Sequence, residues 1–146
     1  MNFGDKMDKL NQNNLKKSYA ILKKALDAYY LEFNTIKSLN LIDDALKIAY
    51  NALFAYQLKS DILRNLNKID EALEVLERGL KINSADHLLL QKRAEILGFY
   101  KNRIPEALSD IQNAINFFEQ SSENQERQLL NLGKIDKSQF LKNYTS

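Results

Sequence analysis

The stretch Leu66-Asn67-Lys68-Ile69-Asp70-Glu71-Ala72-Leu73 combines a helix stop with a helix start. Asn67 is a residue type that can adopt the left-handed conformation in which many helices end. Asp70 and Glu71 carry negative charge in what would be the first turn of the next helix, where the helix dipole favours it. Similar stretches, less regular toward both ends of the chain, begin at Asn13, Leu39, Lys101 and Leu132. The sequence therefore predicts a series of helices joined by one recurring turn.

The composition fits one soluble helical domain. The chain has 146 residues, enough for a single domain with its own core. One proline and four glycines suit long helices, and a net charge of +2 gives little reason to expect nucleic acid as a partner. The chain has no cysteine, which excludes disulfides and thiolate metal sites.

The N-terminal residues show neither a helical period nor a signal-peptide pattern. Residues 1–12 are polar and are expected to form a flexible N-terminus. No run of the sequence is apolar and long enough to insert into a membrane, so a cytoplasmic protein is expected.

Apolar residues recur every three or four positions along most of the chain, which is typical of helices with one buried face. The pattern predicts an all-α fold with helices at about 14–38, 43–66, 69–82, 86–100, 105–119 and 123–132, and a short helix within 136–143. Neither glycine nor proline interrupts the first two segments, so each is expected to be continuous. We expect a single domain over residues 13–146, with the clearest repeats at 53–119 and capping helices at 122–142.

Small residues align when the recurring turns are superposed, and they would let neighbouring helices approach closely. They are separated by 27, 27, 35 and 31 residues and are Ser18, Ala45, Ala72, Ala107 and Ser138. Periods in this range are typical of stacked helical units.

The segment from about 53 to 119 resembles tetratricopeptide (TPR) repeats, which are pairs of antiparallel helices with a period of 34 residues. The order and spacing of large and small residues carry the resemblance. One unit consists of Tyr56, Ser60, Leu63, Asn67, Ala72, Leu76 and Gly79, and the next of Leu90, Ala94, Leu97, Asn102, Ala107, Ile111 and Ala114. Lys59 and Arg93 depart from the family pattern, because a leucine is usual at both positions.

The first half of the chain departs further from the pattern. Units that start near residues 13 and 40 keep the turn but are about seven residues shorter than the family unit, which corresponds to about two helical turns. This predicts that two helices have fused into one, twice, and that residues 14–66 form a long helical hairpin. Fused helices also occur in domain-swapped dimers, so homodimerisation is a second hypothesis.

No constellation of residues predicts catalysis, a cofactor or a metal. His87 is the only histidine, and it has no cysteine or clustered carboxylates as co-ligands. The acidic pairs Asp43/Asp44 and Asp70/Glu71 recur at helix starts, where dipole complementarity explains them. We therefore expect a protein that is not an enzyme.

The resemblance implies a concave groove lined by the first helix of each repeat. The residues that it places there are Tyr30, Asn34, Phe54, Gln57, Leu58, Asp61, Leu88, Gln91, Lys92, Glu95 and Phe99. TPR proteins that hold chaperone C-termini use a clamp of Lys, Asn and Arg, but Tyr30, Leu58 and Leu88 replace parts of that clamp here. The groove is therefore expected to bind another peptide or helix.

The leading functional hypothesis is a non-enzymatic adaptor that binds a protein partner in this groove. A self-associating structural protein and a small secretion-type TPR chaperone are the alternatives. The sequence does not identify the partner.

Overall fold

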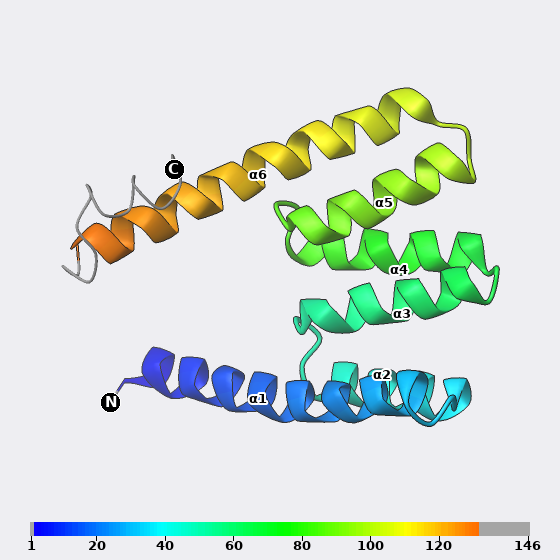
Figure 1. The fold of residues 1–146 in the computed structure, drawn as a ribbon. Helices are drawn as coiled ribbons and strands as arrows, with labels where there is room; N and C mark the ends of the chain where they lie inside the picture. The colour runs from blue at the N-terminus through cyan, green and yellow to red at the C-terminus, as the bar shows by residue number, and fades with distance from the viewer. Residues whose placement is uncertain (1, 132–146) are drawn as a thin grey trace.

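The computed structural model describes residues 2–131, and within that range the chain consists of six helices and no strand. They are α1 (Phe3–Tyr30), α2 (Thr35–Ile48), α3 (Leu53–Asn65), α4 (Ile69–Ile82), α5 (His87–Phe99) and α6 (Ile104–Asn131). Consecutive helices run in opposite directions and stack into a curved array (Figure 1). The predicted all-α repeat stack is confirmed. No helix in the described range is long and apolar enough to cross a membrane.

The prediction of one continuous helix at 14–38 is wrong, because the chain turns between α1 and α2. Phe33 adopts a left-handed conformation with φ of 54°, and the backbone N–H of Asn34 donates to the carbonyl of Ala28 over 2.8 Å. The side chain of Asn34 then caps α2 by accepting a hydrogen bond from the N–H of Lys37 over 3.0 Å. Asn40, the counterpart of Asn67 in the stretch that begins at Leu39, does not end a helix and lies inside α2. A bulky aromatic residue rarely takes a positive φ, and for this reason the sequence pattern did not reveal the turn.

The predicted helix at 43–66 is also divided, by a turn at residues 49–52. Ala49 is extended with φ and ψ of −143° and 97°, and the N–H of Ala52 donates to its carbonyl over 3.2 Å. The turn between α4 and α5 has nearly the same geometry, with φ and ψ of −141° and 95° at Asn83. Both long helices of the expected hairpin are therefore pairs of ordinary helices.

These turns give the correct repeat register. Residues with positive φ stand at Phe33, Asn67 and Asn102, which are 34 and 35 residues apart. Each is followed five residues later by a small residue that lies where two helices meet: Ser38, Ala72 and Ala107. The described chain thus contains three helical pairs whose turns repeat at TPR spacing, namely α1–α2, α3–α4 and α5–α6.

The expected register placed Ser18 and Ala45 at equivalent positions of successive repeats, but they contact each other. The hydroxyl of Ser18 donates to the carbonyl of Ala45 over 3.0 Å, which joins α1 to α2. Ser38 makes the matching contact from α2, donating to the carbonyl of Ala25 over 2.7 Å. Both hydroxyls are buried, so these bonds satisfy polar groups at points where the helices lie close together.

The core consists mainly of two clusters of buried apolar residues along the stack. The first joins α1, α2 and α3 and includes Leu22, Ile42 and Ile62. The second joins α3, α4 and α5 and includes Leu76 and Leu89. A helix that begins a repeat therefore completes the core of the repeat before it.

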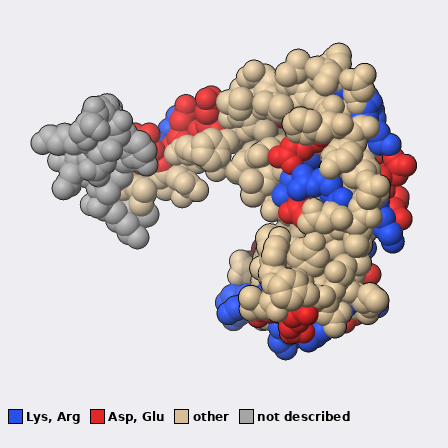
Figure 2. Space-filling model, turned by 45° about the vertical axis from the view of Figure 1, so that its right-hand side comes forward, with Lys and Arg blue, Asp and Glu red and all other residues tan. Residues whose placement is uncertain are grey.

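Helices α1 and α6 are each 28 residues long, twice the length of the others, and both extend beyond the stack. Residues 3–13 of α1, which we call the N-terminal arm, are all exposed. In α6, the predicted break near Ser121 is absent, and the helix continues through that point to Asn131. Both extensions project to the same side of the stack (Figure 1), and the molecule curves around the space between its two lobes (Figure 2).

Several expectations about the chain ends are not tested by the described residues. The flexibility expected for residues 1–12 stays a prediction, although α1 already begins at Phe3. The short helix expected within 136–143, the turn at Leu132 and the last of the small residues, Ser138, lie outside the described residues.

Candidate interaction surface

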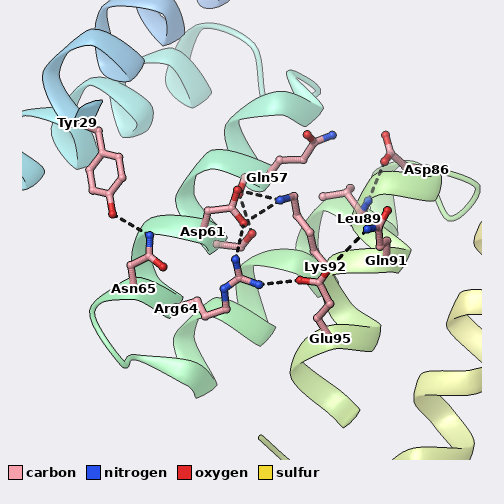
Figure 3. Close-up of polar contacts among 11 residues, drawn as sticks. Tyr29, Gln57, Asp61, Arg64, Asn65, Asp86, Leu89, Gln91, Lys92 and Glu95 are labelled. Carbon is pink, nitrogen blue, oxygen red and sulfur yellow. Dashed lines mark hydrogen bonds and ion pairs between the residues drawn. The ribbon is translucent and has the colours of Figure 1, made fainter. Parts of the chain in front are cut away.

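Several polar residues predicted to line the groove are bonded to one another instead of facing open solvent. Lys92 of α5 donates to both carboxylate oxygens of Asp61 of α3, each over 2.8 Å. One turn further along, Arg64 donates to Glu95 over 2.7 Å, and it also lies 3.8 Å from Asp61 (Figure 3). All four side chains are partly buried. This network binds the first helix of one repeat to the first helix of the next.

The remaining polar groove residues are less committed. Gln91 donates to Glu95 over 3.5 Å, the longest of the side-chain hydrogen bonds in this region. Gln57 lies one turn before Asp61 on α3 and is half-buried (Figure 3). These two amides remain available to a ligand at the edge of the ion-pair network.

Leu58 and Phe54 face the core. Leu58 is 3% exposed and belongs to the cluster that joins α1, α2 and α3, and Phe54 packs against the same cluster. Neither side chain offers an open anchor to a partner. Substitution of Leu58 by aspartate would disturb folding, so it does not serve as a test of binding.

Tyr30 and Asn34 lie at the end of α1 and in the turn after it. Tyr30 is exposed and packs edge-on against Tyr29, with ring centroids 4.9 Å apart. The hydroxyl of Tyr29 accepts a hydrogen bond from Asn65 of α3 over 2.9 Å (Figure 3). Asn34 is occupied as the cap of α2. Neither Tyr30 nor Asn34 is placed against the α5 residues of the predicted groove.

Leu88 and Phe99, the last two predicted residues, belong to a large apolar groove between α5 and α6. Its volume is about 860 Å³, and its apolar surface greatly exceeds its polar surface. The groove is lined by His87, Leu88, Gln91, Ala94, Glu95, Gly98 and Phe99 of α5, and by Ile104, Ala107, Leu108, Ile111, Ala114, Ile115, Phe118 and Glu119 of α6. Figure 2 shows that the upper lobe of the molecule, which contains these helices, is largely uncharged on this face.

The α6 side of this groove was missed because an apolar stripe of helical period is typical of a buried helix face. Leu108, Ile111, Ile115 and Phe118 form a regular helical stripe, and all four are exposed. In the preceding repeat, the equivalent face of α4 is covered by α5. The period of a stripe identifies a face that needs a cover, but it does not show whether the described chain supplies one.

His87 packs against this surface. Its ring lies edge-on to that of Phe118 at a centroid distance of 5.3 Å, so it joins the start of α5 to the middle of α6. In residues 2–131, no group of three or more His, Asp or Glu side chains is arranged to hold a metal ion.

A partly buried ion pair that is not part of the groove lining holds α5 to α6. The guanidinium of Arg93 donates to the two carboxylate oxygens of Asp110 over 2.7 and 2.8 Å, and Asp110 is only 5% exposed. This hydrogen bonding raises the pKa of Arg93, and the negative charge of Asp110 adds to the effect against the opposing effect of burial. Lys59 makes a similar contact to Asp43 of α2 over 2.8 Å. The two departures from the usual leucine are thus explained by ion pairs to second helices.

Comparison with known proteins found a family match for part of the chain. No curated protein matches the sequence. Residues 55–86, which cover most of α3, all of α4 and the turn that leads to α5, match the model of the tetratricopeptide repeat. This match and the helical stack fit a TPR-like helical repeat protein, in which the matched repeat lies between the α1–α2 and α5–α6 pairs.

Proposed function

We propose that this protein is a non-enzymatic adaptor that binds an amphipathic helix of a partner protein in the groove between α5 and α6. Its TPR repeat supports a role as a protein–protein interaction module in general. The observation that carries the specific proposal is the apolar groove of about 860 Å³, which is open along α6.

The groove offers several anchors to a partner. Leu108 is 61% exposed, and Phe99 is exposed even more. Complete burial of one such leucine side chain by a ligand is worth about 1–2 kcal/mol, given the part already covered. A few such anchors at the centre of an interface normally provide most of its affinity. The groove thus has the composition that specific binding requires.

The repeat architecture favours a helix as the ligand over an extended peptide. The equivalent face of α3 and α4 is filled by a helix, α5. The α6 wall runs from Ile104 to Glu119, which is about 22 Å of helix and would accommodate roughly four turns of a ligand. Binding would follow the helix-in-groove mode, with ligand residues three or four positions apart as anchors.

Comparative pull-down from the native cell tests this proposal. Leu108→Asp places a charge in the groove, and its side chain is exposed enough for the fold to tolerate the change. Ile36→Asp is the matched control, because Ile36 is an exposed apolar residue that does not line the groove. Quantitative mass spectrometry should find partners that are retained by wild type and Ile36→Asp and lost from Leu108→Asp. Equal capture by all three proteins would refute binding in this groove.

Self-association remains a second candidate, and one observation favours it. The N-terminal arm exposes the apolar residues Phe3, Met7 and Leu10 along one face of α1. A solvent-exposed apolar stripe on a projecting helix is a typical protein-interaction surface.

A further inference from the structure

The way in which each repeat packs on the one before it indicates what kind of helix fits the open groove. Helix α3 contacts the first repeat through Ala55, Leu58 and Ile62, all buried in the first core cluster. Helix α5 uses the equivalent positions, with Leu89 and Ile96 buried in the second cluster and Lys92 between them. The contact positions are therefore i, i+3 and i+7 of the docking helix.

The middle position of this triplet complements a particular residue of the preceding repeat. The first helix of each repeat has a small residue, namely Ala25, Ser60 or Ala94, and the residue in question comes directly after it. In the first repeat this residue is Leu26, which packs against the cluster that contains Leu58. In the second repeat it is Asp61, which accepts the hydrogen bonds of Lys92. An apolar residue is thus matched by an apolar one, and an acid by a base.

In the third repeat, the corresponding residue is Glu95, which follows the small residue Ala94 and lies in the open groove. A helix that fills the groove in the same way should therefore carry a basic residue at i+3, between large apolar residues at i and i+7. Glu95 already accepts a hydrogen bond from Arg64, just as Asp61 lies near Arg64 while it binds Lys92. A second cation at Glu95 would repeat this arrangement.

The N-terminal arm carries this pattern on its exposed apolar face. Phe3, Lys6 and Leu10 stand at i, i+3 and i+7, and Met7 lies on the same face. Phe3 is 80% exposed and Leu10 is 51% exposed, so no other part of residues 2–131 covers this face. In α5, Leu90 and Ala94 face the second helix of the same repeat. The equivalent positions of the arm are Gly4 and Asp8. Polar residues are acceptable there, because the arm has no second helix to cover that side.

We propose that the groove between α5 and α6 binds the N-terminal arm of a second copy of this protein, with Lys6 paired to Glu95. This proposal rests on the proposed function in one respect, because both assume that a helix binds in the groove. The present proposal adds that this helix is the N-terminal arm of a second copy. Phe3 and Leu10 take the places that Leu89 and Ile96 occupy in the preceding repeat. Because the arm and the extension of α6 project to the same side (Figure 1), two copies can exchange arms reciprocally and close a two-fold dimer.

The oligomeric state of the full chain gives the first test. Light scattering coupled to size-exclusion chromatography should show a dimer for wild type and for Ile36→Asp. The arm variant Phe3→Asp/Leu10→Asp and the groove variant Leu108→Asp should each be monomeric. Mixing the two variants should restore a heterodimer, because one intact arm then meets one intact groove. A monomeric wild type at high concentration, or a dimer that survives in the groove variant, would overturn the proposal.

Charge reversal on the arm tests the pairing with Glu95. Lys6→Glu should weaken the dimer about tenfold, since close charge pairs at interfaces contribute at least that much. Lys23→Glu is the matched control, with the same change of charge on an exposed residue of α1 outside the arm, and it should leave the dimer constant nearly unchanged. Equal effects of the two substitutions would contradict a specific pairing.

A peptide probe separates this proposal from the adaptor function. A fluorescent peptide of residues 2–16 should bind saturably to the arm variant, whose groove is free, and should not bind when Leu108→Asp is added. If the peptide fails to bind while partner capture depends on Leu108, the groove serves another protein and only the present proposal falls. If the peptide binds only after residues 132–146 are removed, the chain's own C-terminal segment fills the groove and the proposal is overturned. If Leu108→Asp abolishes the dimer but does not change partner capture, the adaptor function is refuted and the dimer proposal stands.

Discussion

The ion pair between Arg93 and Asp110 yields a prediction about what holds the groove together. In Arg93→Met, the carboxylate of Asp110 loses the two hydrogen bonds that satisfy it, although it remains 5% exposed between α5 and α6. Breaking a fully buried pair by removing one partner costs about 3–5 kcal/mol. The side chain of Arg93 is 27% exposed, so water can partly replace it. We therefore expect a loss of about 2–3 kcal/mol in the free energy of unfolding.

Urea unfolding and thermal melts, both followed by far-ultraviolet circular dichroism, measure this loss. For a chain of this size the expected loss corresponds to a fall of roughly 5–10 °C in Tm. The double variant Arg93→Met/Asp110→Leu should regain at least half of the lost stability, because it removes the unpaired charge and fills its site with an apolar group. Arg103→Met is the control, since the pair of Arg103 with Glu106 is exposed to solvent and should not affect Tm measurably. If Arg93→Met unfolds at the wild-type midpoint, or if the double variant is less stable than the single one, the ion pair does not stabilise the α5–α6 contact.

Three further predictions concern the turns and the core. Phe33→Gly should raise the free energy of unfolding in urea by about 1 kcal/mol, because Phe33 is exposed and its φ of 54° is strained for a residue with a side chain. A destabilised variant would show that the phenyl ring contributes more stability than the strain costs. Burial raises the pKa of Tyr56, so the fold favours its protonated form, and stability should fall as pH rises through the ordinary tyrosine pKa. Tyr56→Phe should reduce this alkaline loss in melts recorded against pH, while losing stability near neutral pH, where the hydroxyl donates to the carbonyl of Tyr50 over 2.6 Å. Leu22→Ala should cost about 2–5 kcal/mol by the same assay, because Leu22 is fully buried in the first core cluster; a loss below 1 kcal/mol would mean that α1 contributes little to the core.

The second and third repeats could be predicted from sequence because their turn residues follow local chemistry. Asn67 and Asn102 have φ of 60° and 52°, as expected for an asparagine that ends a helix. Asp86 caps α5 through a hydrogen bond from the N–H of Leu89 over 3.0 Å. At each of these points, one residue type with a known conformational preference determines the turn.

The first repeat could not be predicted in the same way, because its turns contradict local preference. Phe33 is held in a left-handed conformation by the packing of α1 on α2, and Ala49 and Ala52 form a turn without glycine, proline or a side-chain cap. Asn40, which looks like a helix stop, lies within α2. Tertiary contacts override the helix and turn propensities of these residues, and such contacts cannot be recognised from the residue types alone.

The candidate site divides along similar lines. The residues of α3 and α5 were correctly assigned to adjacent first helices, but Asp61 pairs with Lys92 and Arg64 with Glu95. Of these four residues, Glu95 alone also lines the groove between α5 and α6. Opposite charges on neighbouring helices look the same in a sequence whether they bind each other or a ligand. Only Leu88 and Phe99 of the predicted apolar residues lie in the groove between α5 and α6.

The path of α6 explains why this groove exists. After α2 and after α4, the chain leaves the helix in an extended conformation, at Ala49 and Asn83, and returns as the first helix of the next repeat. The corresponding point of α6 is Phe118, where the chain stays helical and continues to Asn131. Two predicted helices are therefore continuous near Ser121, where the sequence predicted a break, and not in the first half of the stack, where fusion was expected. Because α6 runs straight past the point of return, no described helix of the same chain covers the face formed by Leu108, Ile111 and Ile115. A longer helix thus leaves a repeat interface open to another chain.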